Sequence, residues 1–346
     1  MLDDMSGLNE LSEMSDLGDI NWGVLGAGYI SRVAMVPALS ALSGARLLAI
    51  AAHDHERATA LAEPYEIERV YDNYQALLDD PDVECVYIAL ANDQHREWTE
   101  HAARAGKHVL CEKPLGRDTA EATIMHNVCD AEGVALMEAL MYRFHPRMDM
   151  ALNMIAQGAI GEPRTVEASF CFTLGDLSNY RLRPEQGGGA LLDVGGYCVS
   201  AARFFFDDEP LTARASARYA DTGADMAVDA LLEFSDGRAA HITCAFDTAD
   251  YQRVTVVGTT GSLELPYAFT AWHDDEAPIL IHHGKRVERV LAPSADPYAQ
   301  MADAFGRAAV SDMPIPYSME NSLAVARALD AIAQAARYGE RVEVAR

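Results

Sequence analysis

Asp193 and Tyr197 carry side chains that can exchange protons with a ligand or bind its hydroxyl groups. They lie in GGGALLDVGGYCVS, residues 187–200, which is typical of a helix that begins after three glycines. Residues four apart share one helix face, so the carboxyl and phenol groups should point the same way. Gly195 and Gly196, between them, each cost a helix about 1 kcal/mol relative to Ala. We interpret them as the feature that lets the backbone approach a ligand closely.

Lys113 supplies a candidate cation. It is one of only three lysines in the chain and lies in LCEKPLGRD, residues 110–118, directly after an apolar run typical of a buried strand. A residue that precedes proline is held extended. We therefore expect Lys113 at the carboxyl edge of a sheet, where open α/β sheets bind their ligands.

The segment WGVLGAGYIS, residues 22–31, resembles a dinucleotide fingerprint. Gly26 and Gly28 occupy the first two positions of the pattern and Ser31 the third. Such glycines allow a tight turn between a strand and a helix, whose first N–H groups then point at a pyrophosphate. A Gly-rich turn without a ligand is the competing explanation of this segment taken alone.

The end of the second expected strand bears on the choice between NAD and NADP. An NAD enzyme places an acidic residue there for the ribose hydroxyls, but the chain has Ala52 at the first candidate position. His53 and Arg57 could face a 2′-phosphate, whereas Asp54 could bind the ribose or cap a helix. This pattern favours NADP, with NAD as the alternative.

The order of the expected elements predicts the fold class. Strands at 20–25, 45–52, 85–90, 107–111 and 134–138 alternate with helices ending near 42 and spanning 55–63, 95–105 and 118–132. This alternation predicts an α/β fold with a parallel sheet, a Rossmann dinucleotide-binding domain over 20–143.

The second half of the chain has a different pattern. A helix at 146–157 precedes alternating strands such as RTVEASFCFTL, with hairpin turns at Asp236-Gly237 and Thr260-Gly261, and a helix over 319–338 closes the chain. We expect residues 144–346 to form an α+β domain with a large, mostly antiparallel open sheet. Residues 1–19 carry six acidic and no basic side chains, which predicts a mobile tail.

Composition excludes several classes of function. The net charge of −26 argues against nucleic-acid binding, and no apolar run is long enough for a membrane span or a secretory signal. We therefore expect a cytoplasmic protein. The six scattered cysteines indicate reduced, buried thiols and no metal site. Salt adaptation and a genomic preference for Arg over Lys both explain the acidic, lysine-poor composition.

Four motifs, GVLGAGYIS, AGKHVLCEKPL, MEALMYRFHP and GGGALLDVGGYCVS, occur in the order and spacing of the Gfo/Idh/MocA oxidoreductase family. The chain resembles this family from residue 20 to 340. The last two motifs most resemble the branch that holds NADP-dependent D-xylose dehydrogenases, dimeric dihydrodiol dehydrogenases and glucose–fructose oxidoreductase. Two positions depart from that branch: Gly196 stands where Cys is common, and His53 stands where an Arg often ends a Ser-Arg pair.

The resemblance implies hydride transfer between a nicotinamide and the hydroxyl-bearing carbon of a sugar, such as C1 of a D-xylose-like aldose, or of a cyclic diol. Tyr197 is then the base, Lys113 favours its phenolate, and Asp193 holds a substrate hydroxyl or Lys113. The family also contains NAD-dependent glycosidases and sugar-sensing regulators that lack catalysis. Retention of both Lys113 and Tyr197 argues against a pure sensor.

These considerations assign residues to three roles. Lys113, Asp193 and Tyr197 are the expected catalytic residues. The expected cofactor-binding residues are Gly26, Gly28, Tyr29, Ile30, His53, Arg57, Asn92, His95, Glu112 and Lys113. The expected substrate-binding residues are Tyr142, Arg181, Arg183, Asp193 and Tyr197, with Arg143 and His145 nearby as walls of the site. Either Arg181 or Arg183 could equally anchor a loop.

The expected partners are a small polyhydroxylated substrate and further copies of the chain. An open sheet needs its outer face covered, so we expect a homodimer or homotetramer formed through the second domain.

Overall fold

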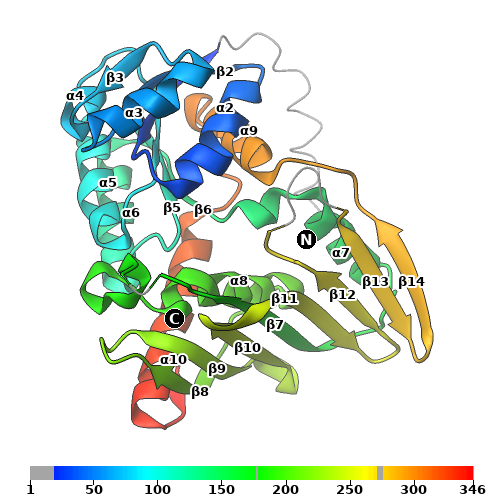
Figure 1. Ribbon diagram of the computed structural model, residues 1–346. Coiled ribbons are helices and arrows are strands. Elements are labelled where there is room, and N and C mark those ends of the chain that lie inside the picture. Colours follow the sequence, from blue (N-terminus) through cyan, green and yellow to red (C-terminus); the bar gives the residue numbers. More distant parts are fainter. Residues whose placement is uncertain (1–18, 177, 271–275, 346) are drawn as a thin grey trace.

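Two sheets organise the molecule (Figure 1). The structure is a computed structural model that describes residues 19–176, 178–270 and 276–345. Except for Asp19, the predicted acidic tail lies outside these residues. In Figure 1 the first sheet and its helices form the upper part, and a larger sheet with helices against it forms the lower part.

The first sheet is parallel throughout, as predicted for a Rossmann domain. Its strand order is β3-β2-β1-β4-β5-β6. The strands are β1 Ile20–Leu25, β2 Ala45–Ala51, β3 Arg69–Tyr71, β4 Cys85–Ile88, β5 His108–Glu112 and β6 Leu136–Ala139. The helices between them are α2 Val36–Ala41, α3 His55–Ala62, α4 Tyr74–Leu78, α5 His95–Arg104 and α6 Thr119–Glu132. The sequence analysis missed β3 and α4, because three and five residues are too few for a periodic pattern.

Local sequence explains where these elements begin. All four residues of β4 are buried, as expected for a central strand with helices on both faces. Asp54 caps α3 by accepting a hydrogen bond from the Arg57 amide at 3.1 Å, so the helix-cap interpretation of Asp54 is confirmed. The helix after β1 opens with a π-helical turn, Ser31–Met35, before α2.

The second sheet has nine strands in the order β14-β13-β12-β11-β7-β10-β9-β8-β15. Every neighbouring pair is antiparallel except β7 and β10, so the mostly antiparallel prediction is confirmed. The strands are β7 Pro163–Thr173, β8 Thr212–Tyr219, β9 Asp225–Glu233, β10 Ala239–Ala245, β11 Asp247–Gly258, β12 Ser262–Pro266, β13 Pro278–His283, β14 Arg286–Leu291 and β15 Val342–Glu343. The predicted hairpin turns connect β9 to β10 and β11 to β12.

Four longer helices surround this sheet or link it to the first one. They are α7 Pro146–Ala156, α8 Gly196–Phe206, α9 Pro297–Val310 and α10 Met319–Tyr338. Helices α8 and α10 pack against the large sheet, whereas α9, which the sequence analysis missed, packs against β1 of the first sheet. A Cβ added at Gly306 of α9 would lie 3.2 Å from the side chains of Ile20 and Trp22. The boundary drawn at 143/144 therefore groups α9 with the second domain although it contacts the first sheet.

Gly195 and Gly196 face other parts of the fold. A π-helical turn, Leu191–Gly195, leads into α8. A Cβ at Gly195 would lie 3.2 Å from the Cys244 sulfur on β10, and one at Gly196 would lie 3.7 Å from Leu329 on α10. Our interpretation that these glycines open the backbone toward a ligand is wrong. Gly195 lets α8 sit close to the sheet, and Gly196 faces α10, where a Cβ would make ordinary contact.

All six cysteines are free and buried, as predicted. Within the described ranges, no helix is long and apolar enough to cross a membrane. In the same ranges, no group of three or more His, Cys, Asp or Glu side chains is placed to hold a metal ion.

Candidate active site

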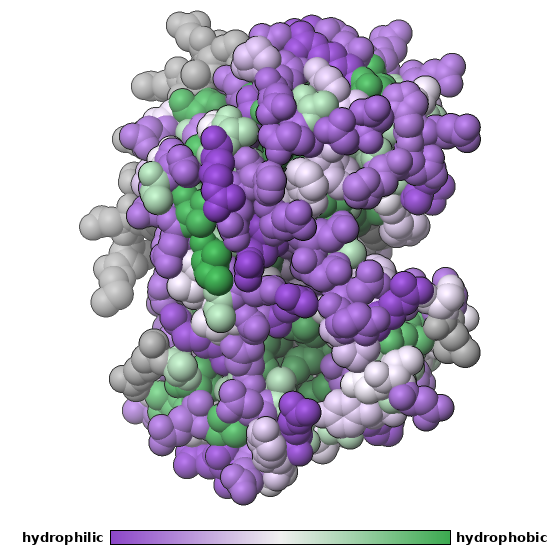
Figure 2. Space-filling view, turned by 90° about the vertical axis from the view of Figure 1, so that its left-hand side faces the viewer, coloured by the Kyte–Doolittle hydropathy of each residue, from purple (hydrophilic) through white to green (hydrophobic). Residues whose placement is uncertain are grey.

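One cavity of about 1240 Å³ is lined by residues of both sheets. The first sheet contributes the turns that follow β1, β2, β4 and β5, and the second contributes the end of β7, the start of β11 and the segment before α8. The face in Figure 2 is mostly hydrophilic, with apolar residues gathered in a hollow of its lower half. The cavity is large enough for two ligands side by side, since drug-sized pockets measure about 300–1,000 Å³.

The glycine turn after β1 fits a dinucleotide. Gly26 has φ +106°, and a Cβ there would lie 2.5 Å from the Ala89 carbonyl oxygen, so only glycine is tolerated. A Cβ at Gly28 would meet no atom closer than 3.9 Å, so this backbone borders open space in the cavity. Ser31 replaces the third glycine and its hydroxyl donates to the Gly26 carbonyl at 2.7 Å. The N–H groups of the following first turn are then available to a pyrophosphate.

His53 and Arg57 lie together at one end of the cavity. The His53 ring packs edge-on against Tyr74, with centroids 4.7 Å apart. The Arg57 guanidinium donates to the Ala27 carbonyl at 3.1 Å, which holds it beside the glycine turn. Both side chains are exposed, so they are accessible to an anionic group bound there.

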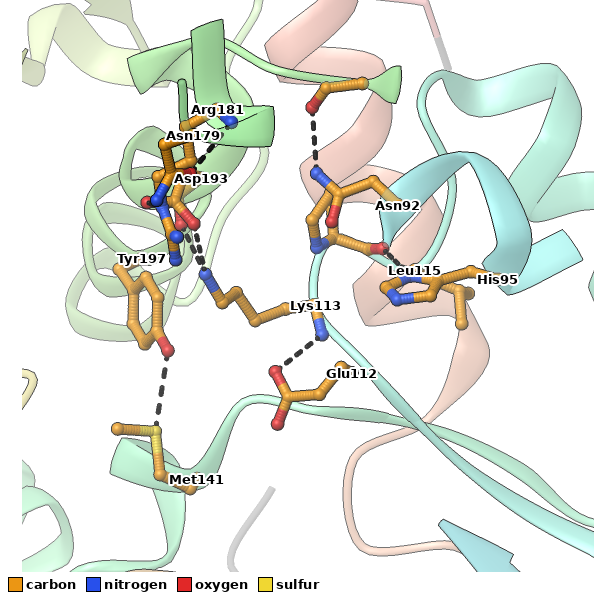
Figure 3. Close-up of polar contacts among 12 residues, drawn as sticks. Asn92, His95, Glu112, Lys113, Leu115, Met141, Asn179, Arg181, Asp193 and Tyr197 are labelled. Carbon is orange, nitrogen blue, oxygen red and sulfur yellow. Dashed lines mark hydrogen bonds and ion pairs between the residues drawn. The ribbon is translucent and has the colours of Figure 1, made fainter. Parts of the chain in front are cut away.

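An ion-pair cluster formed by Lys113, Arg181 and the buried Asp193 lies at the other end (Figure 3). The Lys113 amine donates to Asp193 Oδ1 at 2.9 Å and to its backbone carbonyl at 2.7 Å. Arg181 Nε donates to Asp193 Oδ2 at 2.7 Å. Burial alone would raise the pKa of Asp193, but the two cations outweigh it and lower that pKa to about 2. Asp193 is therefore a permanent anion that fixes both cations.

Tyr197 lies beside this cluster but does not hydrogen-bond to it. Its ring centroid is 5.3 Å from the Lys113 amine, and its hydroxyl donates to the Met141 sulfur at 3.6 Å. Burial raises the pKa of Tyr197 well above 10, and the Lys113 charge offsets only part of that rise. From the sequence we expected Lys113 to lower the pKa of this phenol toward working pH. In the protein without ligands, burial raises the pKa by more than Lys113 lowers it, so the phenol is neutral.

The backbone around Lys113 is held from two sides. Glu112, which lines the cavity, accepts a hydrogen bond from the Tyr87 hydroxyl at 2.5 Å and one from the Lys113 amide at 3.2 Å. Glu138 on β6 accepts one from the Leu115 amide at 3.0 Å. Burial raises the pKa of Glu112, and it raises that of Glu138 to about 7. These contacts fix the segment from which the Lys113 side chain extends.

Most of the predicted site residues line this one cavity. They are Gly26, Gly28, Tyr29, Ile30, His53, Arg57, Asn92, Glu112, Lys113, Arg181, Asp193 and Tyr197. Asn92 also donates to the Gly187 carbonyl at 2.8 Å, which joins the turn after β4 to the segment before α8.

Three of the predicted site residues do not line the cavity. His95 is buried, with its ring nitrogens 2.8 Å from the Pro114 carbonyl and 3.2 Å from that of Leu90, so it braces the ends of β4 and β5. The Tyr142 hydroxyl donates to Ser200 at 2.8 Å inside the core. Arg183 is exposed and donates to the Ser178 carbonyl at 3.0 Å, which is the loop-anchoring alternative.

Arg143 and His145 also lie away from the cavity. The Arg143 guanidinium stacks on the Phe204 ring at 3.7 Å. His145 caps α7, and burial lowers its pKa to about 4.

The sequence analysis missed many residues that line the cavity. They include Met141, Phe170, Phe172, Thr173, Asn179, Tyr180, Asp250, Gln252, Thr270 and Tyr298. Asn179 and Tyr180 adjoin the predicted Arg181, so proximity could have found them. Phe170 and Phe172 share one face of the predicted strand RTVEASFCFTL, and β7 ends at the cavity.

Comparison with known sequences gives matches over both halves of the chain. The model of the "Oxidoreductase family, NAD-binding Rossmann fold" matches residues 20–140, and that of the "GFO/IDH/MocA C-terminal domain" matches residues 148–264. A D-xylose 1-dehydrogenase (NADP(+)) from Haloferax volcanii is 36% identical over 324 residues, 93% of this chain and 99% of the relative. A trans-1,2-dihydrobenzene-1,2-diol dehydrogenase from Mus musculus is 35% identical over 78% of this chain and 79% of its own.

Solved structures show the same fold. A 3-ketoreductase from Actinomadura kijaniata, solved with NADP and TDP-benzene, superposes with a TM-score of 0.88 at 32% identity, over 92% of this chain and 98% of that chain. An aldose-aldose oxidoreductase from Caulobacter crescentus, solved with glycerol, gives 0.87 at 28% identity, over 94% and 99%. The chain therefore belongs to the GFO/IDH/MocA family of oxidoreductases, as its four motifs indicate.

Proposed function

We propose that this oxidoreductase uses NADP to interconvert a hydroxyl and a carbonyl group on a sugar, such as C1 of a D-xylose-like aldose, or on a cyclic diol. The observation that carries the proposal is the placement of Lys113, Asp193 and Tyr197 in the same cavity as the glycine turn. The names of the xylose and dihydrodiol dehydrogenase relatives support the substrate class.

The chain's own residues account for the proton. A bound nicotinamide supplies the hydride acceptor or donor. Asp193, held by Lys113 and Arg181, positions a substrate hydroxyl near Tyr197. Because burial keeps the Tyr197 phenol neutral, it is a proton donor to a carbonyl oxygen in the reductive direction. Alcohol oxidation needs the phenolate, so its rate should rise with pH, whereas the rate of carbonyl reduction should fall once the phenol ionises.

The preference for NADP rests on the end of the cavity that holds His53 and Arg57. Asp54, the nearest acid after β2, caps α3 through its side chain. A 2′-phosphate bound here would meet a guanidinium, whereas the ribose hydroxyls of NAD would find no carboxylate free of a helix-capping role. NAD remains the slower cofactor in this proposal.

Two predictions from the sequence stay predictions: the protein forms a homodimer or homotetramer, and it is cytoplasmic. The large sheet alternates buried and exposed positions, and its exposed positions include Glu167, Asp229 and His241. Light scattering at micromolar concentration should give a mass of two or four chains, and the 37.6 kDa mass of one chain would contradict it.

Absorbance at 340 nm tests the function directly. Purified protein should reduce NADP with at least one member of a panel of aldoses, inositols and dihydrodiols, and should do so more efficiently than it reduces NAD. Cleavage of a nitrophenyl glycoside by protein carrying tightly bound cofactor, without net reduction, would favour the glycosidase alternative. Failure with every compound of the panel would contradict the proposal.

A further inference from the structure

We propose that the substrate end of the cavity is a subsite for an uncharged polyol, and that Asp250 at its edge selects against sugars carrying phosphate or nucleotide groups. This inference rests on the proposed function and narrows its substrate class. It follows from three features: the partners of the cations, the chemistry of the wall and the backbone that presents Asp250.

The cations at the substrate end are already paired with a carboxylate of the chain. The described basic residues that line the cavity are His53, Arg57, Lys113 and Arg181. His53 and Arg57 lie at the dinucleotide end, and both Lys113 and Arg181 pair with the Asp193 carboxylate. A phosphate bound beyond Lys113 would compete with the Asp193 carboxylate for these two partly buried cations.

The remaining wall suits a neutral ring. Asn179, Tyr180, Gln252 and Thr270 offer amide and hydroxyl groups, and Phe172 offers an aromatic surface. The Thr270 hydroxyl donates to Gln252 Oε1 at 2.9 Å, which orients that amide. Sugar hydroxyls both donate and accept hydrogen bonds, so neutral groups of this kind satisfy them without an ionic partner.

An irregularity in β11 presents Asp250 to the cavity. Asp247 of β11 pairs with Thr173 of β7, and the next pair is Tyr251 with Cys171. Between these two pairs β11 advances by four residues and β7 by only two, so β11 bulges. Extra residues of this kind bend a strand and redirect its side chains, and they are frequent beside active sites. The Thr173 hydroxyl, which donates to the Thr248 carbonyl at 2.6 Å, spans the bulge.

Asp250 is exposed at this edge of the cavity. Its one contact in the described part of the chain is a 3.5 Å hydrogen bond from Gln252. In this position the carboxylate can accept hydrogen bonds from a polyol, but it repels a phosphate group that approaches the same edge. The Actinomadura 3-ketoreductase, by contrast, was solved with TDP-benzene, a ligand with a diphosphate.

The test compares D-glucose with D-glucose 6-phosphate as substrates, with NADP at fixed ionic strength. The wild-type protein should prefer glucose in kcat/KM by about ten-fold or more, because charges near a protein surface interact by about 1 kcal/mol or more at short range. Asp250→Lys should reduce that ratio by about ten-fold. Asp221→Lys makes the same charge change at an exposed turn away from the cavity and should leave the ratio unchanged.

The outcomes separate this inference from the proposed function. Equal use of the two sugars by the wild-type protein, or an unchanged ratio in Asp250→Lys, overturns the subsite and leaves the oxidoreductase intact. If neither sugar is oxidised, calorimetric titration of the NADP-loaded protein with the same two compounds replaces kinetics. Tighter binding of glucose then supports the subsite; equal binding, or binding of neither, overturns it.

Discussion

The two ends of the cavity are built in different ways. The dinucleotide end comes from short turns that directly follow β1 and β2, and its glycines are close together in the sequence. The substrate end gathers residues from β5, the segment before α8, the end of β7 and the bulge in β11, which are up to about 140 positions apart. A compact local motif specifies the first end, whereas only the tertiary fold assembles the second.

The difference extends to electrostatics. Arg57 at the dinucleotide end is exposed and available to an anion, whereas Lys113 and Arg181 at the substrate end are fixed on Asp193. The first arrangement suits a charged cofactor. At the substrate end, a buried neutral phenol transfers the proton, and uncharged side chains bind the substrate.

The largest expected effect is at the substrate end. Tyr197→Phe removes the phenol that exchanges the proton but keeps the ring, which packs among Tyr142, Phe170 and Phe269. Turnover should fall by about 10² to 10⁴-fold, with the loss in kcat and not only in KM. NADP affinity, measured by fluorescence titration, should be unchanged.

Tyr142→Phe is the matched control for that variant. It removes a buried phenol hydroxyl whose partner is Ser200 and which does not reach the cavity. Its turnover should stay near that of the wild type, at a stability cost of about 1 kcal/mol for the lost hydrogen bond. Near-full turnover of Tyr197→Phe, or an equal loss in both variants, would show that another group transfers the proton.

The accuracy of the sequence-based predictions follows the same division. Five of the six strands of the first sheet were predictable because they contain long apolar runs, whereas β3 does not. The glycine turn was predictable because its residues are contiguous. Gly195 was misinterpreted because a glycine required by helix packing has the same sequence signature as one that faces a ligand. Asp250 could not be found, since its position depends on a bulge that no local pattern marks.

Predictions of individual side chains failed where a residue's backbone was placed correctly but its partner was unknown. His95 follows β4 as expected, yet the carbonyls of Leu90 and Pro114 turn its ring away from the cavity. Arg181 and Arg183 are two residues apart in the same loop, and only Arg181 reaches Asp193. Such choices depend on contacts between segments distant in sequence.

The next largest effect is at Glu138, which holds the segment that carries Lys113 through the Leu115 amide. Its folded-state pKa of about 7 lies above the usual value for Glu, so ionisation destabilises the folded protein. The favourable contribution of the protonated form is complete below about pH 4.5 and is lost as pH rises through 7.

Glu138→Gln keeps an acceptor for the Leu115 amide without the charge. At pH 8 the variant should be more stable than the wild type by about 3 kcal/mol in urea unfolding, and the difference should vanish near pH 4.5. Glu340→Gln, at an exposed position, should show no such pH dependence. A Glu138→Gln variant that is less stable at pH 8 would show that the ionised carboxylate is required.

The smallest effect is at the dinucleotide end. Arg57→Ala should lower kcat/KM for NADP by about ten-fold, the loss expected for one hydrogen bond to a charged group, and leave that for NAD unchanged. Arg46→Ala, which removes an exposed arginine paired with Glu68 away from the cavity, is the control. Equal losses with both cofactors would contradict recognition of the 2′-phosphate, as would higher efficiency with NAD in the wild-type protein.

A double-mutant cycle between Lys113 and Tyr197 tests the central claim most directly. Lys113→Met removes the cation and keeps much of the stem, and circular dichroism checks that the variant is folded. Because the two residues act through one proton transfer, the double variant Lys113→Met/Tyr197→Phe should lose little more turnover than Tyr197→Phe alone. Losses that multiply, so that the double variant falls by the product of the two single effects, would show that Lys113 and Tyr197 act independently and would contradict the account.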